Sequence, residues 1–257
     1  MSLPFDEVGD GIFRRHYESL DLNVGVLVTD DGVAVIDTRA TPDQARELAD
    51  DIRALTSAPV RWVINTHHHW DHTFGNEVFA DAAIWGHRLC AAALRDSGEA
   101  MREGMLSMVV PDEQAAISAI KITPPDHLFD NTAATLIGDR RVQLRYLGRG
   151  HTDNDIVVVV DKVVFAGDLI EEGNPPFFGD SYPLEWPATV RGLLGLGVDR
   201  FVPGHGDIVD AGFVENQATE LEAVAALCRF YSGEPVDALD GPYPSDVLAT
   251  AIARIPR

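Results

Sequence analysis

The heptapeptide Thr66-His-His-His-Trp-Asp-His72 decides how the rest of the chain is interpreted, because it places histidines and an aspartate at adjacent and alternate positions. It follows the short apolar run Arg61–Asn65, which we interpret as a buried strand. These side chains therefore lie where a strand ends and a loop begins. Imidazole and carboxylate are ligands that a divalent ion such as zinc accepts, so the stretch predicts a metal site.

The spacing within the heptapeptide divides its side chains into two sets. In an extended segment successive side chains alternate, so His67 and His69 point the same way and can hold one ion, while His68 points elsewhere. Asp71 and His72 follow the turn of the chain and can reach a second position close to the first.

Three later residues have a similar setting, each beside glycine at the end of a predicted strand. His151 lies between Gly150 and Thr152, Asp168 follows Gly167, and His205 lies between two glycines. Glycine permits close approach of the backbone, so these side chains can project into a crevice.

The order of elements predicts an α/β protein. Asp30-Asp31-Gly32 between two β-branched runs is typical of a hairpin, and Thr41-Pro42-Asp-Gln44 begins a helix to about residue 56. The remaining predicted elements are strands at 60–65, 82–85, 134–137, 142–147, 156–160 and 163–166, and helices at 76–80, 87–95, 186–196, 215–231 and 245–255. We interpret residues 1–257 as one domain with two related halves. An inserted helical pair at about 96–126 forms either a lid or, with its methionines, ordinary core packing.

Composition narrows the classes of partner. The net charge is −21, with 20 basic and 41 acidic residues, which repels a phosphate backbone and argues against a nucleic-acid partner. The N-terminus has no signal-peptide pattern and no apolar run is long enough for a membrane helix, so we expect a cytoplasmic protein without a membrane partner, acting on a small molecule. Cys90 and Cys228 are interpreted as buried apolar side chains.

Four motifs in this order resemble the ligand series of the metallo-β-lactamase superfamily, over about residues 22–210. They are His67-x-His-x-Asp-His72, Gly150-His-Thr152, Phe165-Ala-Gly-Asp168 and Pro203-Gly-His-Gly206. The resemblance implies an α/β fold, a four-layer αββα sandwich. It assigns His67, His69 and His151 to one metal, Asp71, His72 and His205 to a second, and Asp168 to both.

Two further aspartates are given supporting parts. Asp37 matches the first motif of the family, where it would support a metal ligand; a strand-terminating cap is the alternative. Asp155 is expected to orient the loop of His151 by hydrogen bonds.

The same resemblance implies a hydrolase with two zinc ions, although the superfamily also hosts iron and manganese. A hydroxide bridging the metals would attack an ester, thioester or lactone carbonyl, with Asp71 as the catalytic residue that orients the water and moves its proton. The bridging Asp168 departs from the best-known antibiotic-hydrolysing members. The glutathione thioester hydrolase shares the ligands, but its glutathione-binding residues have no match after His205.

Three alternatives stay open at this point. One is a mononuclear non-haem iron persulfide dioxygenase that uses His67, His151 and Asp168 as a facial triad. The others are a β-lactamase and a metal-binding scaffold without turnover.

Substrate contacts are predicted in the aromatic, proline-rich segment Glu171–Trp186. Phe177 and Phe178 would form an apolar wall for the acyl group, or else pack the loop on itself. Tyr182 would donate a hydrogen bond to the carbonyl oxygen.

Overall fold

The computed structural model describes residues 4–107, 109–231 and 239–256. Strands run through the whole chain: β1 (Asp6–Gly9), β2 (Ile12–Tyr17), β3 (Leu22–Thr29), β4 (Gly32–Ile36), β5 (Val60–Ile64), β6 (Ala83–His87), β7 (His127–Phe129), β8 (Thr132–Ile137), β9 (Arg140–Tyr146), β10 (Ile156–Val160), β11 (Val163–Glu171) and β12 (Arg200–His205). The α-helices are α1 (Pro42–Leu55), α2 (Trp70–Thr73), α3 (Arg88–Leu106), α4 (Pro111–Ser118), α5 (Trp186–Leu194), α6 (Ala211–Tyr231) and α7 (Ser245–Ala253), with 3₁₀ turns η1 (Ser19–Asp21) and η2 (Asn76–Phe79).

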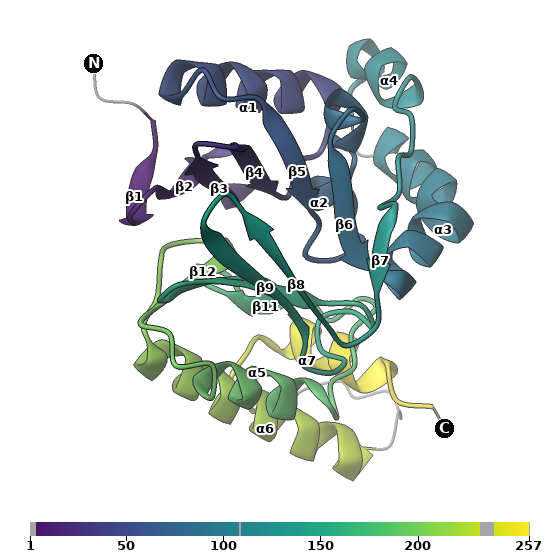
Figure 1. Cartoon of the computed structure of the whole chain (residues 1–257). Helices are drawn as coiled ribbons and strands as arrows, with labels where there is room; N and C mark the ends of the chain where they lie inside the picture. Colours follow the sequence, from purple (N-terminus) through teal and green to yellow (C-terminus); the bar gives the residue numbers. More distant parts are fainter. Residues whose placement is uncertain (1–3, 108, 232–238, 257) are drawn as a thin grey trace.

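The strands form two halves that are joined by the pairing of β3 with β12. The strand order is β7-β6-β5-β4-β3-β12-β11-β10-β9-β8, with β2 and β1 attached beside β3. β3 and β12 share a single register pair, Leu22 with His205. The two halves lie face to face, with α1, α3 and α4 outside one and α5, α6 and α7 outside the other (Figure 1). The expected αββα sandwich is confirmed.

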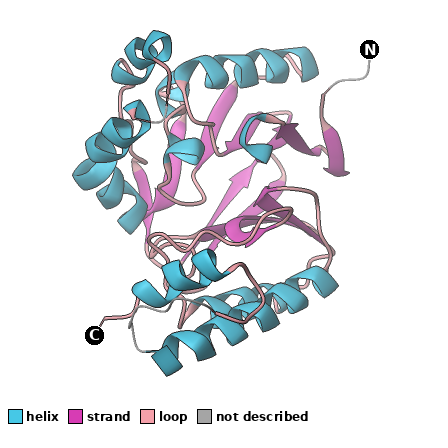
Figure 2. Ribbon diagram, turned by 180° about the vertical axis from the view of Figure 1, so that it is seen from behind, coloured by secondary structure: helices cyan, strands magenta, loops and turns pink. Residues whose placement is uncertain are grey.

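Each interface between layers is filled by apolar side chains. Leu48 and Ile52 of α1 pack on Val26 and Val35 of the first half. Between the halves the core includes residues of β4, β9, β10 and β11. Trp186 of α5 and Leu221 of α6 pack on the outer face of the second half. Burial of large aliphatic side chains, about 1.5–3 kcal/mol each, is the main stabilisation of such layers. Figure 2 shows the same layers from behind.

The hairpin and the start of α1 form as predicted. β3 and β4 pair antiparallel across Asp30-Asp31, and the Thr41 hydroxyl accepts a hydrogen bond from Gln44 N at 3.3 Å. Within the described residues no helix is long and apolar enough to cross a membrane.

Two predicted boundaries were wrong. The helix expected at 87–95 continues to Leu106, and its Gly98 packs against Ile122, since a Cβ there would lie 2.8 Å from Ile122 Cγ2. The helical segment expected at 76–80 is confirmed as the 3₁₀ turn η2, Asn76–Phe79. β11 continues past Asp168 to Glu171, with register shifts around Gly167, whose φ is +54°.

The segment at 96–126 has a small core of its own. Met105, Ile117 and Ile120 are buried with Cys90 and Leu94, and Met101 packs against them. This packing agrees with the core interpretation of the methionines.

Candidate metal centre

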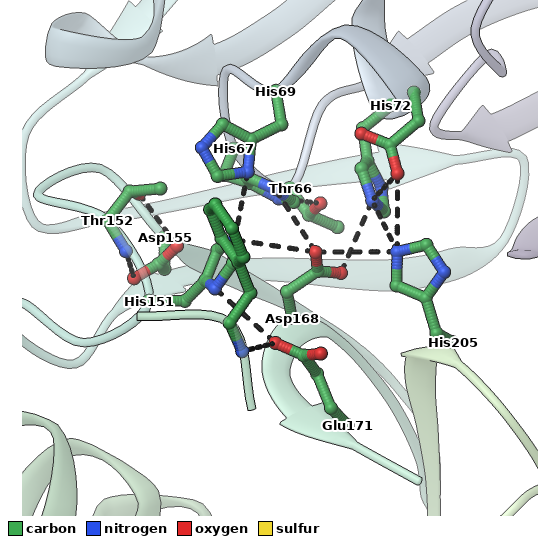
Figure 3. Close-up of polar contacts among 12 residues, drawn as sticks. Thr66, His67, His69, His72, His151, Thr152, Asp155, Asp168, Glu171 and His205 are labelled. Atoms are coloured by element: carbon green, nitrogen blue, oxygen red, sulfur yellow. Dashed lines mark hydrogen bonds and ion pairs between the residues drawn. The ribbon is translucent and has the colours of Figure 1, made fainter. Parts of the chain in front are cut away.

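The predicted ligands come from the ends of neighbouring strands of both halves. The heptapeptide follows β5, His151 lies in the β9–β10 loop, Asp168 lies in β11 and His205 ends β12. The loops of the two halves are tied together, since Ile156 N donates to Thr66 O at 2.8 Å. Figure 3 shows the side chains converging from these elements.

The first group contains the three histidines His67, His69 and His151 together with Asp168, and its donor atoms lie within 4.8 Å of one another. His151 Nε2 is 2.9 Å from His69 Nδ1. Asp168 Oδ2 is 3.5 Å from His67 Nε2 and 3.4 Å from His151 Nε2. As expected from strand alternation, His67 and His69 face the same point; His68 lies outside this group, with its Nδ1 beside the amide of Asn154 at 3.0 Å.

The second group contains Asp71, His72 and His205. His205 Nε2 is 3.4 Å from His72 Nε2 and 3.3 Å from Asp71 Oδ2. α2 begins directly after His69, and this turn of the chain carries Asp71 and His72 to the second position.

Asp168 lies between the two groups. Its Oδ1 is 3.2 Å from His72 Nε2. Its Oδ2 lies 3.5 Å from His67 Nε2 and 3.4 Å from His151 Nε2 in the first group, and 3.5 Å from His205 Nε2 in the second. The adjacent strand permits this placement only because it carries glycine: a Cβ on Gly204 would lie 1.9 Å from Asp168 Oδ1. The predicted close approach of backbone at a glycine is therefore confirmed at this position.

The second ring nitrogen of several of these histidines has its own polar partner. Such partners fix the orientation of an imidazole and are typical of metal sites. The pairs are His72 Nδ1 with Asp37 Oδ2 at 2.8 Å, His205 Nδ1 with Leu20 O at 2.7 Å, His69 Nε2 with Asp180 Oδ2 at 3.0 Å and His67 Nδ1 with Thr66 Oγ1 at 3.0 Å.

Asp37 and Asp155 hold the loops that carry the ligands. Asp37 is buried, has a φ of +65° and also accepts hydrogen bonds from the backbone and hydroxyl of Thr66. Such a backbone conformation is uncommon outside glycine and persists where the surroundings hold it in place. Asp155 accepts from the backbone and hydroxyl of Thr152, next to His151. The hydrogen bonds expected of Asp37 and Asp155 are therefore present.

The charge of the site favours a cation. Burial alone would lower the pKa of His205, but the Asp168 and Asp71 carboxylates raise it to about 11. Burial and the neighbouring Asp168 carboxylate raise the pKa of Glu171 to about 8. Buried carboxylates are costly unless a positive charge compensates them. His67 Nε2, moreover, is buried without a hydrogen-bond partner in the described part of the chain. The donor set, the negative field and this unpaired nitrogen all fit divalent metal ions.

A pocket of about 280 Å³ opens over both groups. Its lining residues are Leu20, His69, Trp70, Asp71, His151, Asp168, Glu171, Asn174, Phe177 and His205. Phe177 is 56% exposed, and its ring centroid lies 6.2 Å from that of His69. The predicted wall residue Phe177 is therefore at the site.

The two other predicted substrate residues lie elsewhere. Phe178 is 1% exposed and packs edge-to-face on Trp186, because adjacent side chains of an extended loop point to opposite sides. The ring of Tyr182 lies beneath the Arg149 guanidinium, 4.5 Å from its centroid, and Tyr182 is not among the lining residues of the pocket. The predictions that Phe178 forms the wall and that Tyr182 reaches the carbonyl are corrected accordingly.

Sequence reasoning missed Asp180 and Glu171 as residues that contact the ligands. Asp180 reaches His69, and the Glu171 carboxylate lies 3.5 Å from His151 Nδ1 while accepting a hydrogen bond from Phe177 N. Glu171 therefore links the loop of Phe177 to a ligand histidine. Asp180 belongs to no sequence motif, so its contact with His69 could be found only from the structure.

We expect Asp180→Ala to weaken zinc binding at the first group about 10–100-fold, because His69 loses the carboxylate that orients its ring. Asp180→Asn keeps a hydrogen-bond acceptor without the charge, so its zinc affinity should lie between those of the wild type and Asp180→Ala. Titration of zinc against a competing chelator measures the affinity. Asp139→Asn, a remote and exposed carboxylate change, is the control, and unchanged affinity in Asp180→Ala would contradict the assignment.

The αββα sandwich carries two adjoining clusters of histidine and carboxylate that could hold metal ions at its strand ends. The sequence model of the metallo-β-lactamase superfamily matches residues 20–205. The chain belongs to the metallo-β-lactamase superfamily.

Individual relatives are distant. The chain is 26% identical over 201 residues to a metallo-β-lactamase type 2 of Elizabethkingia meningoseptica, covering 76% of this chain and 72% of that protein. It is 29% identical over 209 residues to the 2,4-dinitroanisole O-demethylase subunit alpha of Nocardioides sp., covering 77% of this chain and 54% of that protein.

Solved structures agree in fold. A metallo-β-lactamase from Pontibacter korlensis has a TM-score of 0.66 at 20% identity, covering 86% of this chain and 99% of that one. The FIM-1 metallo-β-lactamase of Pseudomonas aeruginosa, in a mono-zinc form, has a TM-score of 0.66 at 19% identity, covering 85% and 94%.

Proposed function

We propose that the chain is a hydrolase with two zinc ions that cleaves the acyl C–O or C–S bond of an ester, thioester or lactone. The observation that carries this proposal is the position of Asp168, whose carboxylate lies within 3.5 Å of histidines from both ligand groups. His67, His69 and His151 would hold the first ion, Asp71, His72 and His205 the second, and Asp168 both. When bound, such ions lower the pKa of a water molecule from 15.7 toward about 7 and polarise a carbonyl oxygen.

The side chains of the pocket have distinct parts in this reaction. Asp71 lines the pocket and has an oxygen 3.3 Å from His205 Nε2, so its carboxylate can orient the attacking water and hold its proton. Phe177 covers the His69 and His151 side of the pocket with an apolar face. Glu171 fixes the start of that loop through Phe177 N at 3.0 Å.

The lining favours an uncharged substrate. No lysine or arginine is among the residues that the structure describes around this pocket, while Asp71, Asp168 and Glu171 are. A substrate with a free carboxylate would find no side-chain cation beside the metals. This favours neutral esters and lactones over β-lactams. Because a similar protein is a metallo-β-lactamase, β-lactams still belong in any substrate test.

The alternative of a mononuclear iron oxygenase uses three of the same residues. The convergence of Asp71, His72 and His205 on a second point supports two metals over one. Metal identity separates the two reactions directly.

The decisive experiment combines metal analysis of the purified protein with a hydrolysis panel of lactones, esters, thioesters and β-lactams. The O-demethylase relative adds an aryl methyl ether to this panel. We expect two zinc ions per chain and the highest kcat/KM on a neutral ester, thioester or lactone. One iron per chain with oxygen consumption, or turnover restricted to β-lactams, would contradict the proposal.

A further inference from the structure

A second pocket, which we call the side pocket, adjoins the metal centre and has a volume of about 440 Å³. It lies between η1, the start of α1 and the pair α3–α4. Its lining residues are Ser19, Leu20, Ala40, Thr41, Asp43, Gln44, Trp70, Met105, Val109, Ala116 and Ile117. Leu20 and Trp70 also line the pocket over the metals, so the two spaces share a wall. In Figure 1, α3 and α4 lie on the same outer side of the sandwich as α1.

The walls of the side pocket are mainly apolar, and the side chains of Thr41, Gln44 and Asp43 already have polar partners. The Thr41 hydroxyl accepts from Gln44 N, and the Gln44 side chain accepts from Ala40 N at 3.2 Å. Asp43 is paired with Arg46. Neither lysine nor arginine is among its described lining residues. A cavity of this size and composition fits a hydrocarbon group better than a charged one.

The residues of the shared wall are held in place by contacts with the candidate metal centre. Leu20 is 45% exposed and has a φ of +65°, a conformation that is costly for a leucine. Its carbonyl accepts the Nδ1–H of His205 at 2.7 Å. Trp70 stands between His69 and Asp71 at the start of α2. A substrate that lies across Leu20 and Trp70 would therefore have a fixed position relative to the predicted metal-binding residues.

We propose that the side pocket binds an uncharged hydrocarbon arm of the substrate, while the carbonyl group to be attacked occupies the pocket over the metals. This rests on the proposed function, which it deepens by naming the substrate class: neutral esters or lactones with a long alkyl chain. Specificity then depends on the α3–α4 segment, whose Met105, Val109, Ala116 and Ile117 form the far wall.

The first test follows kcat/KM over a series of neutral esters with increasing acyl length. Each methylene that enters the pocket should raise kcat/KM about fourfold until the pocket is full. Ala116→Phe fills the pocket from α4 and should end this rise several methylenes earlier, with metal content unchanged. Ala115→Phe, at the neighbouring exposed position, is the matched control and should behave as the wild type. Val109→Phe repeats the test from another wall if Ala116→Phe does not fold.

A binding test separates this inference from the proposed function. Calorimetric titration of the metal-loaded protein with linear alcohols from butanol to decanol needs no turnover. Affinity should rise about fourfold per methylene and fall about tenfold or more for the longer alcohols in Ala116→Phe. Chain-dependent binding without any ester hydrolysis would overturn the proposed function alone. Ester hydrolysis without chain dependence, or equal binding to wild type and Ala116→Phe, would overturn the side-pocket assignment.

Discussion

Asp168→Ala should reduce the metal content from two ions per chain to one or fewer and lower kcat/KM by more than about 10³-fold. Its carboxylate faces both ligand clusters, at 3.4 Å from His151 Nε2 and 3.2 Å from His72 Nε2. Losing it removes a ligand from each ion and the charge that compensates them, and several kcal/mol of transition-state stabilisation correspond to about three powers of ten.

Elemental analysis after dialysis measures the metal content, and steady-state kinetics on the best substrate of the panel measures kcat/KM. Asp207→Asn, an exposed acid two residues after His205 with a side chain 86% exposed, controls for a general loss of negative charge. Two metals per chain in Asp168→Ala would refute the bridging assignment.

Asp71→Asn should lower kcat about 10²–10⁴-fold while the first ligand group retains its ion, because none of the three histidines of that group is changed. An amide preserves the shape of the side chain but cannot take up the proton of the attacking water. Its oxygen still faces His205, so loss of the second ion should be partial. Asp168→Ala, in contrast, affects both ions.

Measuring kcat with saturating zinc separates loss of proton transfer from loss of metal. If excess zinc restored the full wild-type kcat of Asp71→Asn, then Asp71 would act only as a ligand. Asp153→Asn changes a partly buried acid in the His151 loop that belongs to neither group. It should retain kcat within about twofold, because the amide keeps the shape and the oxygen acceptor of the side chain.

The sequence predicted which side chains converge, because its signals are local. Alternation along an extended segment places His67 beside His69, and glycine beside His205 marks the approach of backbone that the structure shows at Gly204. The seven predicted ligands converge in two groups, which no single motif required. The hairpin and the cap of α1 likewise depend on neighbouring residues only.

Features that depend on distant contacts were not predicted. Asp180 lies 111 residues from His69, and nothing in its neighbourhood marks the contact. Phe177 and Phe178 are adjacent, and only the packing of Trp186 decides which of them is buried. The same holds for α3, where the weak pattern near Gly98 reflects a contact with Ile122 instead of a helix end.

The single register pair between β3 and β12 has a mechanical consequence. Leu22 with His205 is the one register pair between β3 and β12 in the described strands, with the Gly206 N to Asp21 O hydrogen bond beside it. His72 belongs to one half and His205 to the other. An ion bound by both histidines would link the two halves of the sandwich. Its binding free energy would therefore add to the stability of the folded protein. The metal centre would then also stabilise the fold, and its occupancy by metal would change the free energy of unfolding.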